Sequence, residues 1–523
     1  MWLFIGGLIQ DVGVGPINFC AACSYRGETV KEALSRWGGF SWPLVVGAGG
    51  FLFAMARGKS ILSDGDTYWH IAAGRWIVEH GAIPSADPFS HTLAGAVWTA
   101  HEWLAEVIFY FVFQAGGWPG VVVLTGLAFA ATLAYLARFL HAYLAPAHVL
   151  IFSILALAMA SPHLLARPHM LAMPLLLVWS AGIVRACEAG RMPGLWLLGI
   201  MTLWANLHGG FTLGIALAAA FGIEAVLLAG DKAEKLVAAR RWGVFLLLAI
   251  AAGALTPHGL EAYFFAAKVL GMSYALANLN EWSSPDFQKF QFLEVWLMLF
   301  IAAALARGIR LSPVRLAILL VLLHLALKHA RNVGLLGLLS PLLLAYPLRE
   351  QWGAPQGPES QTKNLDGFFM RHAQPASAVS VALVFVVLGA IAFHKLGQGA
   401  FEPPDKLHPV AAVRAVKEAG IKGPVYNSYM FGGYLVFSGI PVFIDGRADM
   451  YGDEFLEQFL EAYRHPHSGD MERMLDKYDV NWTLLQANAP AVEWLDQLPG
   501  WQRFYSDKTA VVHVRRAGDH GQP

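Results

Sequence analysis

Charged residues are scarce in this sequence. Asp, Glu, Lys and Arg make up 14% of its 523 residues, whereas ordinary soluble domains carry about 25%. Hydrophobic residues make up 56%, and the mean hydropathy is +0.48. This combination predicts an integral membrane protein. An excess of either charge is also absent, because 37 basic and 37 acidic side chains cancel. The balance excludes the basic character that a nucleic-acid partner requires.

Cysteine is rare as well. Cys20, Cys23 and Cys187 are too few for a disulfide framework. Cys20 and Cys23 form a CxxC pair, but no second pair accompanies it to complete a four-cysteine zinc motif. Apolar runs continue beyond residue 390, which excludes a single signal peptide followed by a soluble enzyme.

Long apolar segments dominate the first three quarters of the chain. Eleven of them approach the roughly 20 residues that a membrane-spanning helix needs. Several are interrupted by Pro or Gly, which is tolerated at membrane depth where the backbone is buried in protein or lines a cavity. We therefore predict a bundle that surrounds a site. The predicted spans are residues 41–57, 118–138, 147–162, 169–186, 194–208, 210–229, 243–256, 291–307, 314–329, 332–348 and 376–394.

Lys and Arg are concentrated in alternate connections between these spans, which predicts that those connections are cytoplasmic. Residues 1–40 are then a cytoplasmic segment, and residues 41–394 form the transmembrane domain with a first outer loop at 58–117. Residues 103–114 are expected to form a helix at the outer surface, with Glu102 and Glu106 on one side. The more polar residues 395–523 follow on the outer side.

The tail has the pattern of a small α/β domain. Helices are predicted over residues 409–419, 455–463 and 471–478, and strands near 482–485 and 510–514. The run GPVYNSYMFGGYLVFSGIPVFIDGRADMY alternates like further strands. The predicted fold class is therefore mainly α: a polytopic bundle of about eleven helices with a C-terminal extracytoplasmic α/β domain.

Two aspartates follow the first predicted span. Asp66 and His70 are four residues apart, so a helix beginning here places them on one side. A carboxylate at this position can remove a proton from an acceptor hydroxyl, and Asp64 and Asp66 together can hold a divalent cation through oxygen ligands. Asp is also favoured as a helix N-cap. These interpretations are compatible with one another.

His101 and Glu102 stand at the far end of the first outer loop. If the loop folds back, they face Asp64 and Asp66 across a cleft. If it does not, they belong to a solvated loop end.

Polar residues recur at the outer ends of other predicted spans. Each alone is typical of a helix end or of a long side chain that reaches the interface. Together they gather on one side, and charged groups at membrane depth are costly and usually functional. Because Arg and Lys can bind a lipid-linked phosphate, we predict a site for an anionic headgroup at the outer face. These residues are Arg167, His169, Asn206, His208, Glu281, Lys328, His329 and Arg331.

In the tail, FIDGRADMYGDEF contains Asp, Gly and Arg where a strand is expected to end. Such residues are favoured in turns for backbone reasons. The alternative is that Asp445, Arg447 and Asp449 contact substrate or lock the tail onto the bundle.

The segment ILSDGDTYWHIAAGRWIVEHG, followed by AIPSADPF and HEWLAEVIF, is similar to the first outer loop of the GT-C superfamily of polyprenyl-phosphate-dependent glycosyltransferases. The pattern resembles protein O-mannosyltransferases and the bacterial aminoarabinose transferases of lipid A. RPH, NLHGGF, NEWSSP and FIDGRADMYGDEF resemble an uncharacterised bacterial branch. HEWL stands where that superfamily has Lys- or His-Pro-Pro-Leu, so His101 matches in position and the Pro-Pro is missing. The resemblance covers most of the chain.

The resemblance implies transfer of a sugar from a polyprenyl-phosphate carrier to a saccharide, lipid or protein acceptor. The reaction would take place at the outer face of a bacterial cytoplasmic (inner) membrane, with inversion at the anomeric carbon. The catalytic base would be Asp64 or Asp66, and Arg167, Lys328 and Arg331 would stabilise the departing phosphate. Further contacts would come from His70, His101, Glu102, His169, His208 and His329. No cofactor is required by the resemblance, although the spacing of Asp64 and Asp66 permits Mg²⁺ or Mn²⁺.

Two other functions fit a polytopic chain. A transporter or flippase of a lipid-linked saccharide would have paired broken helices in an inverted repeat, a pattern this sequence lacks. A non-catalytic membrane subunit of an envelope-polymer assembly would use the tail as its binding module, and Asp64 and Asp66 would then be replaceable.

Overall fold

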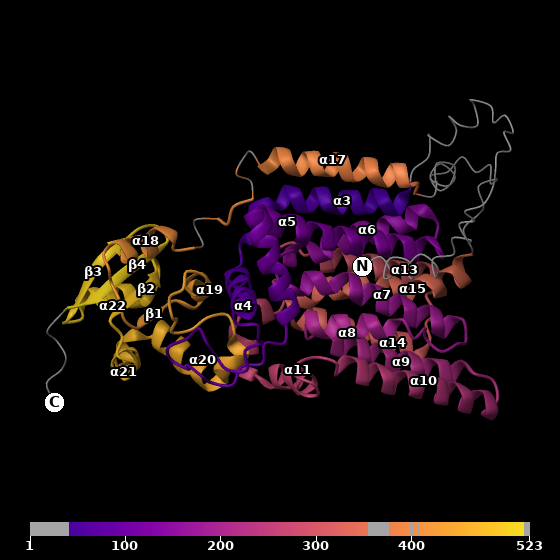
Figure 1. Cartoon of the computed structure of the whole chain (residues 1–523). Coiled ribbons are helices and arrows are strands. Elements are labelled where there is room, and N and C mark those ends of the chain that lie inside the picture. The colour runs from indigo at the N-terminus through magenta and orange to yellow at the C-terminus, as the bar shows by residue number, and fades with distance from the viewer. Residues whose placement is uncertain (1–40, 354–375, 397–398, 400, 405–407, 517–523) are drawn as a thin grey trace.

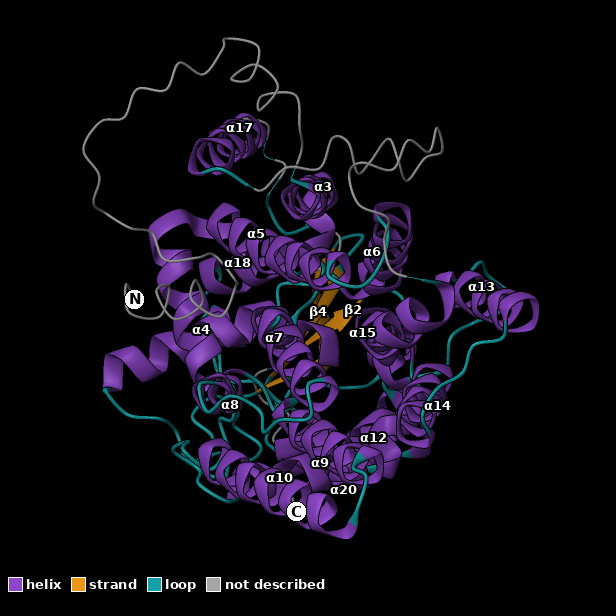
Figure 2. Cartoon of the chain, turned by 90° about the vertical axis from the view of Figure 1, so that its right-hand side faces the viewer, coloured by secondary structure: helices purple, strands orange, loops and turns teal. Residues whose placement is uncertain are grey.

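The computed structural model describes residues 41–353, 376–396, 399, 401–404 and 408–516. The predicted N-terminal segment and its CxxC pair lie outside the described residues. Figure 1 shows an elongated molecule with a helical bundle at one end and a smaller mixed region, formed by residues 408–516, at the other. Figure 2 shows the bundle end on, with α17 (Ala378–Leu396) outermost beside α3 (Trp42–Arg57).

The bundle and its outer connections contain the first fourteen α-helices of the described chain. They are α3 (Trp42–Arg57), α4 (Asp66–His80), α5 (Trp103–His141), α6 (Pro146–Ala160), α7 (Pro168–Glu188), α8 (Leu197–Leu207), α9 (Phe211–Leu228), α10 (Lys232–Gly253), α11 (Glu261–Gly271), α12 (Ser273–Asn278), α13 (Phe292–Arg307), α14 (Pro313–Lys328), α15 (Val333–Trp352) and α17 (Ala378–Leu396). Short 3₁₀ turns follow or precede several of them: η1 (Gly58–Leu62), η2 (Ser161–His163), η3 (Asn280–Trp282) and η4 (Ala330–Asn332).

Sequence signals account for several helix ends. Pro146, Pro168 and Pro313 occupy the first turn of α6, α7 and α14, where the missing N–H would have no helical partner. Asp231 caps α10 by accepting the backbone N–H of Glu234 at 2.8 Å. α4 ends at Gly81, which has a left-handed φ of 61°.

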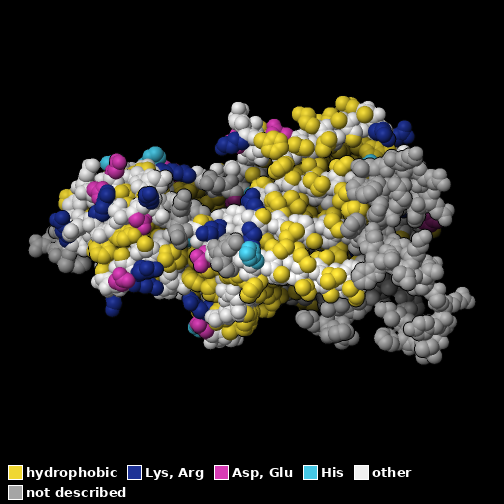
Figure 3. Space-filling model, turned by 90° about the horizontal axis from the view of Figure 1, so that it is seen from above, with side chains coloured by type: hydrophobic (Ala, Val, Ile, Leu, Met, Phe, Trp, Pro, Cys, Tyr) yellow, Lys and Arg dark blue, Asp and Glu magenta, His cyan; other side chains and the backbone are white. Residues whose placement is uncertain are grey.

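Within the described residues, eight helices are long and apolar enough to cross a membrane. The chain is therefore a mainly helical, multi-pass membrane protein with eight candidate spans among the described residues, fewer than the eleven predicted. The other three predicted spans coincide with α8, α13 and α14, which have 11, 16 and 16 residues and are shorter than the eight candidates with their adjoining 3₁₀ turns. The parity of the crossings depends on the number of spans, so the predicted orientation of the two ends stays a prediction. Apolar side chains cover much of the bundle in Figure 3, whereas charged ones gather over the tail.

The predicted surface helix at residues 103–114 is the first part of α5. A kink at Gly117, where φ is 58° and ψ is −154°, separates it from the remainder of α5. The sequence therefore placed the break correctly. The expectation that this part lies along the membrane surface stays a prediction.

The tail contains a four-stranded mixed sheet. Its strands lie in the order β1 (Val425–Asn427), β2 (Trp482–Gln486), β4 (Ala510–Arg515) and β3 (Trp501–Ser506). β1 pairs with β2 in parallel, and β4 is antiparallel to both β2 and β3. Its elements are α18 (Val410–Glu418), β1 (Val425–Asn427), η6 (Tyr429–Phe431), α19 (Gly432–Phe437), α20 (Ala448–Arg464), η7 (Pro466–Ser468), α21 (Asp470–Lys477), β2 (Trp482–Gln486), α22 (Pro490–Gln497), β3 (Trp501–Ser506) and β4 (Ala510–Arg515).

The alternating run in the tail is only partly extended, which corrects the prediction of several strands there. Val425–Asn427 is a strand, but the following residues form η6 and α19. Asn427 Oδ1 accepts the backbone N–H of Phe443 at 2.9 Å, and its Nδ2 donates to the carbonyl of Ile444 at 2.8 Å. The side chain of Asn427 thus satisfies backbone groups that a neighbouring strand would otherwise bind. The alternation of residues along the sequence does not reveal this contact.

Two hydrophobic cores are present among the described residues. One fills the helical bundle. The other fills the tail and also includes Trp69, Ala72 and Ala73 of α4 and Trp98 of the first outer loop. Part of the loop is therefore buried together with the tail, although the two are more than 300 positions apart in the sequence.

Candidate functional site

Five charged side chains form a connected network where the first outer loop meets α7. The guanidinium of Arg167 lies between two aspartates: Nε is 2.7 Å from Oδ2 of Asp64, and Nη2 is 2.8 Å from Oδ2 of Asp66. Its Nη1 donates a 2.6 Å hydrogen bond to Oε2 of Glu281. The other oxygen of Glu281 is 3.4 Å from Nη1 of Arg331. The network therefore joins four segments of the chain around one guanidinium.

Local structure fixes the two aspartates. Oδ1 of Asp64 accepts the backbone N–H of Asp66 at 2.9 Å, and α4 begins at Asp66. Asp64 thus helps to start the helix and also contacts Arg167, as the two compatible interpretations of this motif allow. His70 follows one turn later, so the predicted helix is confirmed.

The position of Arg167 follows from Pro168, which begins α7. A residue before proline is held in extended backbone, and Arg167 has φ −125° and ψ 159°. The preceding Ala166 donates its N–H to the carbonyl of Ile61 at 2.9 Å and accepts the hydroxyl of Thr67 at 2.9 Å. These bonds attach the start of α7 to the aspartate turn.

The acids of this network differ in their affinity for a proton. Burial raises the pKa of Asp66 to about 7, with the negative charges of Asp64 and Glu281 acting in the same direction and Arg167 opposing them. Burial would also raise the pKa of Glu281, but Arg167 and Arg331 outweigh it and lower that pKa to about 2. Glu281 is therefore ionised at neutral pH, whereas Asp66 is present in both its protonated and its ionised form.

A second cluster joins the two ends of the first outer loop. Oε1 of Glu102 is 3.7 Å from Nε2 of His101 and 3.5 Å from Nε2 of His208. Oε2 of Glu102 is 3.8 Å from Nε2 of His70. Burial raises the pKa of Glu102 to about 8 and lowers that of His101 to about 4. The cluster is therefore mainly uncharged at neutral pH, and its polar atoms are separated by more than an ordinary hydrogen bond.

The contact between Glu102 and His70 places the end of the first outer loop beside α4, the helix that begins at Asp66. The loop thus folds back as one of the two sequence interpretations predicted, and His101 and Glu102 do not form a solvated end. The structure also includes Glu106, one turn after Glu102, whose Oε1 is 3.5 Å from Nδ1 of His70. The sequence indicated this residue through its four-residue spacing from Glu102, which places both acids on one side of the helix.

Several predicted site residues have protein partners of their own. The side chain of Asn206 accepts from the indole of Trp103 at 2.9 Å and donates to two backbone carbonyls. His169 Nε2 donates to the carbonyl of His163 at 3.1 Å, and Nδ1 of His329 to that of Trp282 at 2.5 Å. Lys328 is exposed, and in the described part of the chain no ion pair joins it to the network. These four residues are therefore peripheral to the two clusters.

Two tail residues are electrostatically coupled to the clusters. The sequence named Asp449 as a residue that contacts substrate or locks the tail, and it did not single out Tyr429. Asp449, at the start of α20, has a pKa raised by burial to about 6, and its charge acts on Glu102. The phenol of Tyr429 has its pKa raised by burial and by the nearby charges of Asp66 and Glu281. The coupling of both residues to the clusters depends on how the tail docks, which no local pattern in the sequence reveals.

The two aspartates do not fit a divalent cation in this arrangement. Arg167 contacts an oxygen of each at 2.7 and 2.8 Å. A metal ion bound to the same oxygens would lie beside the positive charge of the guanidinium and be repelled by it. Across the described ranges, no group of three or more His, Cys, Asp or Glu side chains is arranged to hold a metal ion. The predicted option of Mg²⁺ or Mn²⁺ at Asp64 and Asp66 therefore finds no support in the donor set.

Comparison with solved structures finds similarity over most of the chain. The oligosaccharyltransferase of Archaeoglobus fulgidus in its apo form has 9% sequence identity and a TM-score of 0.48, with 91% of this chain and 75% of that chain covered. AglB of the same organism, in complex with an inhibitory peptide and a dolichol-phosphate, has 10% identity and a TM-score of 0.49, covering 91% and 74%. ArnT from Cupriavidus metallidurans, bound to undecaprenyl phosphate, has 16% identity and a TM-score of 0.43, covering 91% and 98%. No protein-family model matches the sequence, and comparison with curated protein sequences finds no match.

Proposed function

We propose that this protein is a membrane glycosyltransferase that moves a sugar from a polyprenyl-phosphate carrier to an acceptor hydroxyl at the extracytoplasmic face. The proposal is supported by the resemblance of the first outer loop to the GT-C superfamily. The observation that carries it is the acid network, in which the Asp64 and Asp66 turn of that loop meets Arg167 and Glu281. Buried acids with displaced pKa values, next to cationic groups, are typical of catalytic sites.

Asp66 is the better candidate for the base. Its pKa of about 7 is near the operating pH, where a general base is most effective. Both oxygens of Asp64 are already engaged, one by the N–H of Asp66 and the other by Arg167. In the proposed reaction, Asp66 takes the proton of the acceptor hydroxyl and that oxygen forms a bond to the anomeric carbon. The bond from this carbon to the phosphate oxygen breaks, and the polyprenyl phosphate leaves with the electron pair.

Arg331 is the better candidate for the phosphate contact. Each nitrogen of Arg167 that faces the network already has a carboxylate partner. Arg331 has one carboxylate partner in the network at 3.4 Å, and 29% of its side chain is exposed. Lys328, three residues earlier at the end of α14, adds an exposed positive charge. We therefore assign Arg167 to holding the carboxylates and Arg331, with Lys328, to the departing phosphate.

The second cluster is suited to hydroxyl groups. Glu102 and the imidazoles of His70, His101 and His208 leave polar atoms 3.5 to 3.8 Å apart. Neutral imidazole and a protonated carboxyl each offer both a donor and an acceptor. A sugar hydroxyl needs that pair of functions. We propose that this cluster binds hydroxyls of the sugar or of the acceptor beside Asp66.

The test is transfer of a labelled sugar from a polyprenyl phosphate to membrane acceptors by the wild type, Asp64→Asn and Asp66→Asn. Asp286→Asn is the matched control, because Asp286 is exposed in the same outer region as Glu281. We expect Asp66→Asn to lower the rate about 100-fold or more, the usual effect of losing a general base, and the control to retain wild-type transfer.

Unchanged transfer by both first-loop variants at matched protein levels would contradict the proposed role of these aspartates. Absence of transfer by the wild type with every polyprenyl-phosphate sugar tested would contradict the proposed reaction.

A further inference from the structure

The tail is attached to the two segments that carry the acids of the network. One attachment lies at the aspartate turn. A Cβ on Gly433, in α19, would collide with the carbonyl of Gly65, and a Cβ on Gly446 would collide with Oδ1 of Asp66. The same position at Gly446 would be 3.0 Å from the indole nitrogen of Trp69. Only glycine permits so close an approach of backbone to these groups.

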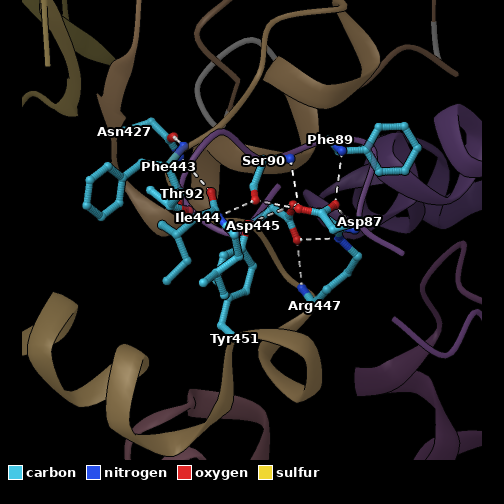
Figure 4. Close-up of polar contacts among 11 residues, drawn as sticks. Asp87, Phe89, Ser90, Thr92, Asn427, Phe443, Ile444, Asp445, Arg447 and Tyr451 are labelled. Atoms are coloured by element: carbon cyan, nitrogen blue, oxygen red, sulfur yellow. Dashed lines mark hydrogen bonds and ion pairs between the residues drawn. The ribbon is translucent and has the colours of Figure 1, made fainter. Parts of the chain in front are cut away.

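A second attachment holds the middle of the first outer loop (Figure 4). Ser90 forms a parallel β-bridge with Val442, in which Val442 donates its N–H to the carbonyl of Phe89 at 3.0 Å. The hydroxyl of Thr92 donates to the carbonyl of Phe443 at 2.7 Å. The loop thus runs beside the tail like an added strand.

A buried ion cluster reinforces that bridge. Nη1 of Arg447 donates to Oδ1 of Asp87 at 2.7 Å, and Nη2 donates to Oδ2 of Asp445 at 2.6 Å. The Arg447 side chain is 1% exposed and both acids are 0% exposed. Its guanidinium also lies 5.1 Å from the ring centroid of Phe89 and 4.7 Å from that of Trp98. Of the two sequence interpretations of this motif, the structure supports the locking one for Arg447 and Asp445.

A third attachment holds the segment before Glu281. The carboxylate of Asp453, in α20, accepts the backbone N–H groups of Tyr274 and Ala275, each at 2.9 Å. It therefore caps α12, which leads to Glu281 within a few residues. Arg464, at the end of α20, donates to the side chain of Asn278 at 2.9 Å.

We infer that the tail is a positioning scaffold for the acid network: Gly433, Gly446, Arg447 and Asp453 hold the turn of Asp64 and Asp66 and the segment of Glu281 in their mutual arrangement. These are positioning residues and need not contact substrate. The inference rests on the proposed function only for its effect on catalysis. Its structural part, that the tail fixes the aspartate turn, is independent of any reaction.

The experiment compares full-length Gly446→Ala with wild type by amide hydrogen exchange in detergent. Gly271→Ala is the matched control, because a Cβ there meets nothing within 4 Å. We expect the peptide covering residues 63–70 to exchange about tenfold faster in Gly446→Ala because the added methyl displaces Asp66. Peptides from the centre of α7 should keep the wild-type rate, which separates a local effect from unfolding.

The same variants are then assayed for sugar transfer. Displacement of a catalytic group by about 1 Å costs about 100-fold in kcat, so Gly446→Ala should lose kcat with little change in the KM for the donor lipid. Arg447→Lys keeps the charge but loses the planar fork that holds Asp87 and Asp445 on separate nitrogens. It serves as the second variant if Gly446→Ala does not fold. It should show the same pattern to a smaller extent.

Unchanged exchange of residues 63–70 in a folded Gly446→Ala or Arg447→Lys protein would overturn the inference. Faster exchange at that turn without loss of kcat would overturn its catalytic part. If the wild type transfers no sugar but the exchange result is as expected, the proposed function fails and the scaffold role remains.

Discussion

Nη1 of Arg167 donates a 2.6 Å hydrogen bond to Oε2 of Glu281, a residue 114 positions away in the chain. The same guanidinium contacts Asp64 and Asp66. Removing one partner from a shielded ion pair is costly because the charges left behind lose their compensation. The side chain of Arg167 is 20% exposed, so water screens the charges and reduces this cost.

The first prediction concerns that guanidinium. Arg167→Gln should lower the free energy of unfolding by about 3 kcal/mol, the low end for a broken buried pair, because some exposure allows water to screen the three acids. Arg167→Lys should lose less, since it keeps the charge but not the planar fork. Thermal unfolding of the detergent-solubilised protein measures both. Arg473→Gln, at an exposed pair with Asp470, is the control; an equal loss there would contradict the prediction.

The second prediction concerns the pH dependence of transfer. Because the pKa of Asp66 is raised to about 7, the fraction of its base form increases as the pH rises through 7, and the rate should rise with it. Glu281→Gln removes a negative charge that raises this pKa, so the midpoint should move about 0.5 to 1 pH unit toward acid. A rate profile from pH 5.5 to 8.5 checks both statements. If the midpoint does not move in Glu281→Gln, the group whose titration controls the rate is not Asp66.

The third prediction concerns Glu102 and stability. Its pKa is raised by burial to about 8, so between about pH 4.5 and 8 the folded state retains a proton that the unfolded state releases. Stability therefore falls as the pH rises through this window. Glu102→Gln is the uncharged isostere and should remove this contribution, which amounts to about 3 to 4 kcal/mol between pH 5 and 8. The measurement is the difference between the thermal midpoints of variant and wild type across that range, and a constant difference would contradict the assignment.

The fourth prediction concerns a cluster at the opposite end of the bundle. Arg315 lies 3.0 Å from Glu224 and 3.2 Å from Glu188, and all three side chains are at most 8% exposed. Arg315→Leu should destabilise the protein by about 3 to 5 kcal/mol because two buried carboxylates lose the cation that pairs with both of them. Thermal unfolding is the measurement. Arg310→Leu, an exposed position in the same connection, should stay near the wild-type midpoint, and an equal fall in both would point to a general effect of charge removal.

Periodicity and composition were sufficient for the local features. Apolar runs located every long helix of the bundle, and the DGD turn before HIAAGRW predicted the start of α4 at Asp66. These features depend on neighbours within one or two helical turns, where a single sequence is informative. Apolar content alone did not separate the three shorter helices, α8, α13 and α14, from the eight longer candidate spans.

The membrane character, the helical bundle and the gathering of polar residues near Asp64 and Asp66 were thus determined by the sequence itself. Tertiary structure decided which of those residues share a guanidinium, and that Asn206, His169 and His329 have other partners. It also brought Gly446 and Arg447, more than 320 positions after the end of the first outer loop, into contact with that loop. The physical reason is distance along the chain. Helices depend on the pattern of residues that are close in sequence, whereas these ion pairs and close backbone contacts form between segments that only the folded chain brings together.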